Sequence, residues 1–295
     1  MTGAGTVLVL GATGFLGGRI VDEFEAAGVE VAAASRPEGD LLDPAGLREL
    51  IARTAPDTVV NAAGMTSPAI ARERPADCFA VNTGGMLNLL EAVRLEAPGA
   101  RVLALSSAAV YAGEPPFTEN SPTAATTPYA ASKIAMEILC GQYSRGHGMT
   151  VTVLRCFNLT GPGEPASQAT SEFARAAIEA GAGGRAEVRV GEPATARDFT
   201  DVRDAARAIR LLAEGEHDGT FDLCSGSATS LQELAGMISE LSGAELSLRG
   251  SGTGQPASGL LSVRGDASKL ALATGWKPEI GLRESLADLL DSLGA

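Results

Sequence analysis

A short apolar run, a glycine-rich turn and an amphipathic helix follow one another at the start of the chain. The run Thr6–Leu10 suits a buried parallel strand. The turn Gly11–Gly17 has the spacing Gly-x-x-Gly-x-x-Gly, so a pyrophosphate can approach its backbone while the following helix N-terminus faces the negative charge. This order predicts a dinucleotide site, although a lone glycine triplet can also be a plain tight turn. The predicted helix has one apolar face, formed by Leu16, Ile20, Phe24 and Ala27.

The rest of the chain alternates apolar strands with helices. This alternation predicts an α/β fold with a Rossmann-type doubly wound parallel sheet. Strands are expected at 29–34, 57–61, 101–107, 150–155, 188–192, 219–224 and 245–249. Helices are expected at 44–54, 82–95, 128–146, 168–181, 201–214, 230–241 and from residue 282.

A tyrosine and a lysine stand four residues apart at the start of one predicted helix. Pro128 suits the first helical position, and Thr126 or Thr127 can cap the helix. Residues i and i+4 share a helix face, so Tyr129 and Lys133 lie side by side. A neighbouring ammonium group is expected to lower the pKa of the phenol and make it an acid/base near neutral pH. The alternative is an ordinary surface pair.

Composition excludes several kinds of partner. The net charge is −13 and no Lys or Arg run stands out, which argues against nucleic acid or an anionic membrane. No apolar run approaches the roughly 20 residues of a membrane span, and no secretory signal is visible, so we expect a cytoplasmic protein with reduced thiols. A metal site is not expected, because the cysteines and histidines are few and scattered. They are Cys78, Cys140, Cys156, Cys224, His147 and His217.

Further motifs join the glycine turn and the tyrosine–lysine pair. Ser106-Ser-Ala-Ala-Val-Tyr111 ends a predicted strand, and Arg197-Asp-Phe-Thr-Asp-Val202 leads into a predicted helix. Together these segments resemble the extended, sugar-nucleotide-modifying branch of the short-chain dehydrogenase/reductase superfamily, the NAD-dependent epimerase/dehydratase family. The resemblance covers nearly the whole chain. The segments Phe157–Gly163 and Val190–Asp204 are most similar to 4-ketosugar nucleotide reductases of the GDP-6-deoxy-mannose reductase type.

The resemblance implies a role for individual residues and a domain division. The dinucleotide-binding domain would span residues 1–157, with the segment 187–226 partly returning to it, and a smaller C-terminal α/β substrate-binding domain would take up most of 158–295. The catalytic residues would be Ser107, Tyr129 and Lys133. Cofactor contacts would come from Gly11, Thr13, Gly14, Phe15, Leu16, Ser35, Arg36, Asp40, Leu41, Ala62, Ala63, Gly64, Tyr129, Lys133 and Cys156. Substrate contacts would come from Thr66, Ser107, Ala108, Asn158 and Arg197.

The end of the second strand bears on the choice of cofactor. NAD sites carry an acidic residue near this point, whereas this chain has Ser35-Arg36, and Glu30 lies at the start of the strand. A hydroxyl and a guanidinium suit a 2′-phosphate, so NADP is predicted, with NAD as the alternative. Arg36 would otherwise be a surface arginine in a turn. Asp40-Leu41 resembles the family's pair at the adenine.

Two departures from the family pattern limit the function. Dehydratases of the family carry an Asp-Glu pair after the catalytic serine or threonine, where this chain has Ala108 and Ala109, so elimination of water is not expected. Sugar-nucleotide enzymes also carry an arginine and an acidic residue near the C-terminus, where this chain has the segment 254–259. Arg249 or Arg264 could compensate for that arginine.

These observations predict an NADPH-dependent enzyme that reduces the keto group of a nucleotide-linked 4-keto-6-deoxy sugar. Tyr129 would be its general acid. One alternative is an NAD-dependent nucleotide-sugar 4-epimerase with the same three catalytic residues. Another is a non-catalytic NADP-sensing binding protein. By resemblance alone, we also expect a homodimer formed through helices around residues 72–97 and 128–146.

Overall fold

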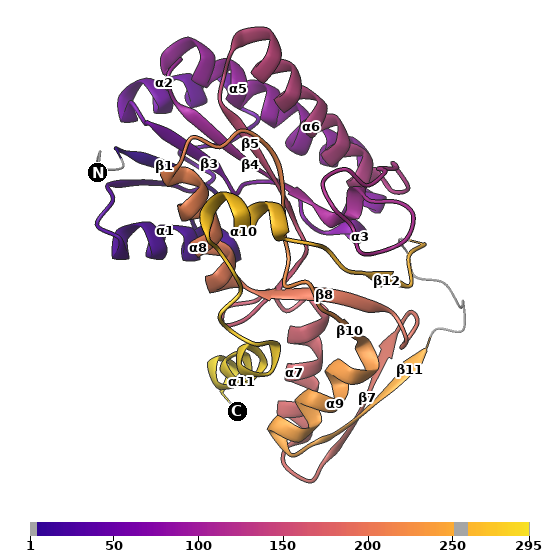
Figure 1. Ribbon diagram of the computed structural model, residues 1–295. Coiled ribbons are helices and arrows are strands. Elements are labelled where there is room, and N and C mark those ends of the chain that lie inside the picture. Colours follow the sequence, from indigo (N-terminus) through magenta and orange to yellow (C-terminus); the bar gives the residue numbers. More distant parts are fainter. Residues whose placement is uncertain (1–4, 251–258, 295) are drawn as a thin grey trace.

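The computed structural model describes residues 5–250 and 259–294. Figure 1 shows a larger part, built on one sheet, above a smaller part that holds most of the later segments. Of the segment 254–259, where the sequence lacks the expected arginine, only Gly259 lies among the described residues.

The larger part contains a six-stranded parallel sheet with the order β2-β1-β3-β4-β5-β9. This is the doubly wound α/β fold that the sequence predicts. Strand β9 joins the sheet from far along the chain and pairs with β5. In sheet order the strands are Val31–Ala34, Val7–Leu10, Thr58–Asn61, Arg101–Ser107, Val151–Cys156 and Gly219–Leu223.

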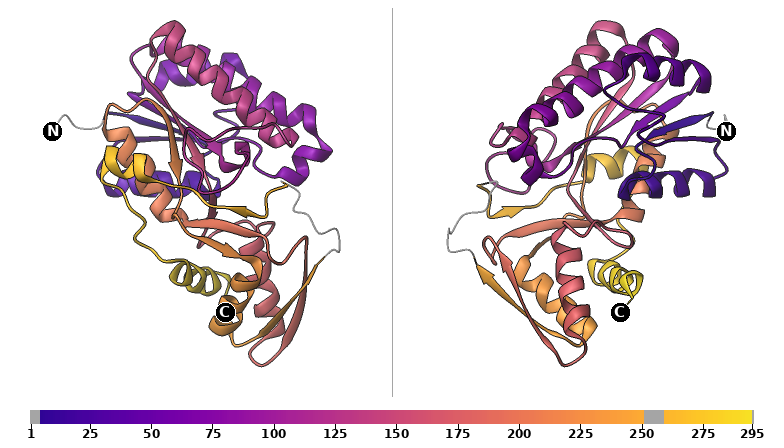
Figure 2. Two further views of the ribbon diagram at one scale, coloured as in Figure 1. Left: turned by 45° about the vertical axis from the view of Figure 1, so that its right-hand side comes forward. Right: turned by 180° about the vertical axis from the view of Figure 1, so that it is seen from behind.

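Helices cover both faces of this sheet (Figures 1 and 2). One face packs against α2 (Pro44–Thr54), α5 (Gly85–Glu96) and α6 (Pro128–His147) in a mainly apolar layer. The other face packs against three more helices and the buried indole of Trp276. These are α1 (Phe15–Ala26), α8 (Val202–Glu214) and α10 (Ser268–Thr274). Among the described helices, none is long and apolar enough to cross a membrane.

Local signals explain the start of α6, the helix that carries the tyrosine–lysine pair. The Thr127 hydroxyl accepts a hydrogen bond from Ala130 N at 3.1 Å, and Pro128 occupies the first turn. The helix ends at Gly148, whose φ of 67° is the left-handed conformation that glycine tolerates. Both ends of this helix therefore follow from nearby residues.

The segment before α5 differs from the prediction of one helix over 82–95. It is divided into short helices, α3 (Pro68–Glu73) and α4 (Pro75–Phe79), and a π-helical turn η1 (Ala80–Gly84) leads into α5. Each short helix begins at a proline, which suits a first helical position and lacks the N–H needed inside a helix. The π-turn places Asn82 among buried side chains.

The smaller part has its own apolar core. Here α7, α9 and α11 pack around Phe173, Leu234 and Leu286. Its helices are α7 (Ala169–Ala180), α9 (Leu231–Ser242) and α11 (Leu282–Leu293). Its strands are β6 (Asn158–Thr160), β7 (Arg185–Val190), β8 (Ala196–Asp201), β10 (Ala228–Ser230), β11 (Glu245–Gly250) and β12 (Ser262–Val263). Strand β8 occupies the Arg-Asp-Phe segment and pairs with β6, β10 and β12, whereas the sequence predicted only the helix that follows.

Candidate active site

The predicted site residues gather at one edge of the six-stranded sheet. Gly11 follows β1, Ser35 follows β2 and Ala62 follows β3, while Ser107 ends β4 and Cys156 ends β5. All these strands are parallel, so their carboxyl ends lie at the same edge. Ligands of doubly wound folds bind in the crevice outside these ends.

The glycine turn forms a tight backbone cradle. Gly11 has a φ of 75°, and a Cβ placed on it would lie 2.8 Å from Ala63 N. A Cβ on Gly17 would overlap the carbonyl oxygen of Gly11. Gly14 is the N-cap of α1 and is exposed, and no side chain caps this helix. The cradle therefore fits the pyrophosphate of a dinucleotide, which needs close backbone approach and a free helix N-terminus.

The other residues predicted to contact the phosphates or the adenine end of the cofactor lie at the glycine turn, at the start of α1 and after β2. Thr13 is exposed at the turn, and Phe15 and Leu16 form the partly buried first positions of α1. Arg36 is exposed, and Leu41 is buried against α2 and α5 in the core. Leu41 therefore serves packing in this structure, in addition to the adenine contact that the resemblance implies.

The loop after β3 is pinned by Asn82, a residue that had no predicted ligand role. Its Oδ1 accepts a hydrogen bond from Met65 N at 2.9 Å, and its Nδ2 donates to Met65 O at 3.0 Å and to Ser132 Oγ at 3.0 Å. Gly64 lies against this amide, where an added Cβ would be 3.0 Å from Asn82 Oδ1. This anchoring sets the position of the exposed Thr66.

Tyr129, Lys133 and Ser107 come together beside this loop. Tyr129 is 7% exposed and Lys133 is 5% exposed. Ser107 lies beside the phenol of Tyr129, near enough to lower its pKa. The Lys133 ammonium donates to Leu105 O at 2.8 Å and lies 6.0 Å from the centre of the tyrosine ring. The pair is therefore buried, and the alternative of an ordinary surface pair is wrong.

Burial controls the protonation of this pair. It raises the pKa of Tyr129 to about 12, while the hydrogen bond from Ser107 acts in the opposite direction. Burial also lowers the pKa of Lys133. The expectation that Lys133 brings the tyrosine pKa down is therefore not met in this structure, because desolvation disfavours the phenolate. The phenol keeps its proton at neutral pH and can donate it.

One face of α6 binds three consecutive residues of β4. Tyr129, Lys133 and Glu137 are each one turn apart, and they contact the β4 residues 105–107. Lys133 donates to Leu105 O and Glu137 Oε1 accepts from Ser106 Oγ at 2.5 Å, while Tyr129 lies beside Ser107. These contacts determine how the tyrosine lies relative to the strand end.

Behind these contacts lies a buried polar chain that the sequence did not reveal. Arg155 forms an ion pair with Glu137 at 2.7 Å and donates to Tyr111 Oη at 3.1 Å. Tyr111 Oη in turn donates to Asp222 Oδ1 at 2.5 Å. The only sequence signal for the role of Glu137 is its position one helical turn after Lys133. Within the described residues, Asp222 Oδ2 has no hydrogen-bond partner, and burial raises the pKa of this carboxyl to about 7.

The predicted substrate residues lie around β6, β8 and the turn after Ser107. Ala108 is buried in the 3₁₀ turn η2 (Ala108–Val110), and Asn158 is exposed at the start of β6. Arg197 is half-buried, and its guanidinium donates to Ala196 O at 2.7 Å and to Leu261 O at 3.3 Å. Burial lowers the pKa of Arg197. The diphosphate contacts of Asn158 and Arg197 remain predictions.

The aspartate of the Arg-Asp-Phe segment has a structural role that was not predicted. Asp198 is fully buried and accepts hydrogen bonds from Ser225 N at 2.7 Å, Gly226 N at 3.0 Å and Gly265 N at 3.3 Å. These bonds tie β8 to the loop after β9 and to the residues after β12. The motif therefore joins the two parts of the molecule.

The two arginines considered for nucleotide binding lie in different places. Arg249, on β11, is exposed and pairs with Glu187 at 3.5 Å. Arg264 is exposed and lines a hollow of about 370 Å³ together with Cys224 and Trp276. Of the two, Arg264 therefore lies nearer to a carboxyl end of the sheet, that of β9.

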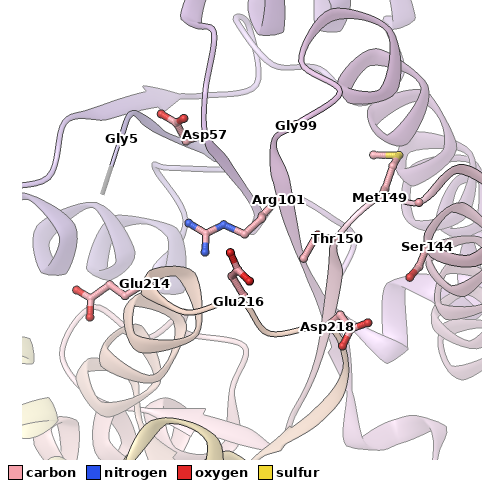
Figure 3. Close-up of a pocket in the computed structure, with 11 residues that line it drawn as sticks. Gly5, Asp57, Gly99, Arg101, Ser144, Met149, Thr150, Glu214, Glu216 and Asp218 are labelled. Carbon is pink, nitrogen blue, oxygen red and sulfur yellow. The ribbon is translucent and has the colours of Figure 1, made fainter. Parts of the chain in front are cut away.

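A larger hollow lies at the opposite, amino edge of the sheet (Figure 3). It has a volume of about 790 Å³ and is lined by acidic side chains around Arg101, which donates to Gly215 O at 2.5 Å. Asp57, Glu214, Glu216 and Asp218 supply the acidic groups. None of the predicted site residues lines this hollow, so the candidate site remains at the carboxyl edge.

Sequence comparisons agree with this geometry. The model of the NAD dependent epimerase/dehydratase family matches residues 7–224. The chain is 33% identical over 291 residues to GDP-6-deoxy-D-mannose reductase of Pseudomonas aeruginosa, an alignment that covers 96% of this chain and 95% of that protein. It is 26% identical over 314 residues to UDP-glucose 4-epimerase of Lacticaseibacillus casei, with 92% of each chain covered.

Two solved structures share the whole architecture. The structure of RMD from Pseudomonas aeruginosa complexed with NADPH has a TM-score of 0.84 and 31% identity, with 98% of each chain covered. The complex of Thermus thermophilus UDP-glucose 4-epimerase with NAD has a TM-score of 0.88 and 28% identity, with 98% of this chain and 99% of that chain covered. This protein therefore belongs to the NAD dependent epimerase/dehydratase family, which confirms the resemblance seen in its motifs.

Gly17→Ala tests the glycine cradle. The added methyl group collides with the Gly11 carbonyl, so we expect a loss of about 1–3 kcal/mol in the free energy of unfolding, measured by urea denaturation, and weaker dinucleotide binding. Gly18→Ala is the matched control, because its nearest contact is 3.5 Å away and alanine favours a helix. Equal stability of the two variants would contradict the close approach of Gly17 to the Gly11 carbonyl.

Asp222→Asn tests the buried carboxyl. The pKa of Asp222 is about 7 in the folded state and about 4 in the unfolded state. At pH values between these two, the carboxyl takes up a proton on folding, so its contribution to stability falls as pH rises through this window. From pH 5 to pH 8 the wild type should lose about 2–3 kcal/mol of unfolding free energy relative to Asp222→Asn. The exposed Asp218→Asn is the control. Parallel pH profiles for wild type and Asp222→Asn would show that the carboxyl titrates normally.

Proposed function

We propose that this protein is an NADPH-dependent ketoreductase acting on a nucleotide-linked 4-keto-6-deoxy sugar. The observation that carries the proposal is the buried Tyr129, with its proton retained and Ser107 beside it, at the carboxyl edge of a doubly wound sheet. The similarity to a GDP-6-deoxy-D-mannose reductase over nearly the full length supports the substrate class.

The cofactor would lie across the carboxyl edge. Its pyrophosphate would rest on the glycine turn at the start of α1, its adenine end near Asp40, and its nicotinamide ribose near Tyr129 and Lys133. The nicotinamide supplies hydride chemistry when it is bound. Ser35 and Arg36 support NADP(H) as the cofactor, and NAD(H) remains the alternative. The division into a dinucleotide-binding domain (1–157) and a substrate-binding domain (158–295) is part of this proposal.

The side chains of this chain would handle the proton. Tyr129 would donate its phenolic proton to the carbonyl oxygen as the carbonyl carbon becomes a carbinol carbon. Ser107 would donate a hydrogen bond that orients and polarises the same oxygen. The cation of Lys133 would favour the phenolate left on Tyr129. Ala108 and Ala109 hold no titratable group, so nothing at these positions would support elimination of water.

The principal alternative is a nucleotide-sugar 4-epimerase. The UDP-glucose 4-epimerases among the relatives favour it, because an epimerase can use the same three catalytic residues. Stoichiometric oxidation of NADPH with a GDP-linked 4-keto-6-deoxyhexose would support the reductase, whereas interconversion of two sugars without net NADPH oxidation would support the epimerase. A protein that binds the cofactor but converts neither class of substrate would be a sensor.

We also propose a homodimer formed through the helices around residues 72–97 and 128–146. Within the described residues, four of the eight exposed large apolar side chains lie on these helices. They are Phe79, Leu87, Leu95 and Ile138. Light scattering should give twice the monomer mass, and Ile138→Asp should lower that mass. A monomeric wild type would exclude this assembly.

Tyr129→Phe tests the mechanism. Removal of the phenolic proton should lower the rate of NADPH oxidation by about 10²–10⁴. Tyr143→Phe is the matched control, because Tyr143 lies on the same helix but donates to Glu91 at 2.6 Å, within the helical layer. Near-full activity of Tyr129→Phe would exclude this tyrosine as the acid.

A further inference from the structure

A carboxylate occupies the place where the sequence predicts a phosphate-binding group. Glu38 Oε2 accepts a hydrogen bond from Ser35 N at 3.1 Å and also bonds the Ser35 hydroxyl. The turn is closed by backbone bonds from Glu38 N and Gly39 N to Ser35 O, at 3.2 and 2.9 Å. Glu38 therefore folds back over the end of β2.

The packing of this turn limits where the backbone at Glu38 can go, while the Glu38 side chain is exposed. Gly39 is buried, and an added Cβ there would lie 2.8 Å from Leu10 Cδ2 and 3.3 Å from Ala34 Cβ. The backbone after Glu38 is thus pressed against the strand ends. The hydrogen bond from Ser35 also lowers the pKa of Glu38, so its carboxyl is ionised at neutral pH.

The second phosphate-binding candidate faces a carboxylate as well. Arg36 Nε lies 3.8 Å from Asp40 Oδ2, and the other oxygen of Asp40 accepts from Leu42 N at 3.0 Å. The Arg36 side chain is 76% exposed, so this ion pair is weak and can exchange. Both groups that suit a 2′-phosphate therefore have a carboxylate partner within the chain, and the bond to Ser35 is the better formed of the two.

We infer that Glu38 is a specificity-determining residue of the cofactor site, which competes with a 2′-phosphate for Ser35 and repels it. This inference rests on the proposed dinucleotide site. A 2′-phosphate brings negative charge close to an ionised carboxylate, whereas a 2′-hydroxyl can donate a hydrogen bond to it. Glu38 thus weakens the preference for NADP(H) that Ser35 and Arg36 create.

Direct binding titrations with NADPH and NADH test this inference without a sugar substrate. Glu38→Gln removes the charge but keeps the length of the side chain, so it should raise affinity for NADPH about tenfold and leave affinity for NADH unchanged or lower. Glu30→Gln is the matched control, because it removes the same charge from an exposed residue at the start of the same strand. It should leave both affinities unchanged. Arg36→Gln should lower the affinity for NADPH alone.

The outcomes separate this inference from the proposed function. If wild type binds both dinucleotides and Glu38→Gln leaves their affinity ratio unchanged, the role of Glu38 is overturned while the dinucleotide site stands. An equal gain in Glu30→Gln would show a general charge effect and would also overturn it. If neither dinucleotide binds to the wild type or the variants, the proposed function fails and this inference fails with it.

Discussion

The contact between one face of α6 and the end of β4 determines the geometry of the candidate site. Lys133 and Glu137, one turn apart, bind Leu105 O and Ser106 Oγ of β4, and Tyr129 lies one turn before Lys133, beside Ser107. A shift of the helix along the strand would break both hydrogen bonds. The phenol therefore stands in a defined place beside the Ser107 hydroxyl.

Burial of polar groups gives this edge of the sheet its chemistry. Lys133, Arg155 and Asp222 are each less than 10% exposed, and charges so placed are costly unless paired. The shifts follow from this cost, since burial raises the pKa of Tyr129 to about 12 and that of Asp222 to about 7 and lowers that of Lys133. The site thus favours the protonated phenol, which is the form that a general acid requires.

Local signals in the sequence predicted much of the fold. The helix Pro44–Thr54 has the predicted bounds because Asp43 caps it and Pro44 occupies its first turn. Apolar runs predicted the strands of the large sheet because strands buried on both faces are apolar throughout. The segment before α5 was predicted less well, since the π-turn at residues 80–84 depends on what Asn82 contacts. Short strands such as β10 and β12 have no periodic pattern of their own and form only by pairing with β8.

By itself, the sequence determined the family, the doubly wound sheet and the residues at its strand ends, because these depend on residue type and local spacing. The tertiary structure decided which groups surround those residues. Tyr111 and Asp222 meet although they are 111 residues apart, and no local pattern links them. The contact of Glu38 with Ser35 spans only three residues and is local, although Gly39 of the same turn packs against the sheet. Burial and charge at the site depend on such long-range packing, and therefore the direction of the Tyr129 pKa shift could not be predicted from the spacing of Tyr129 and Lys133.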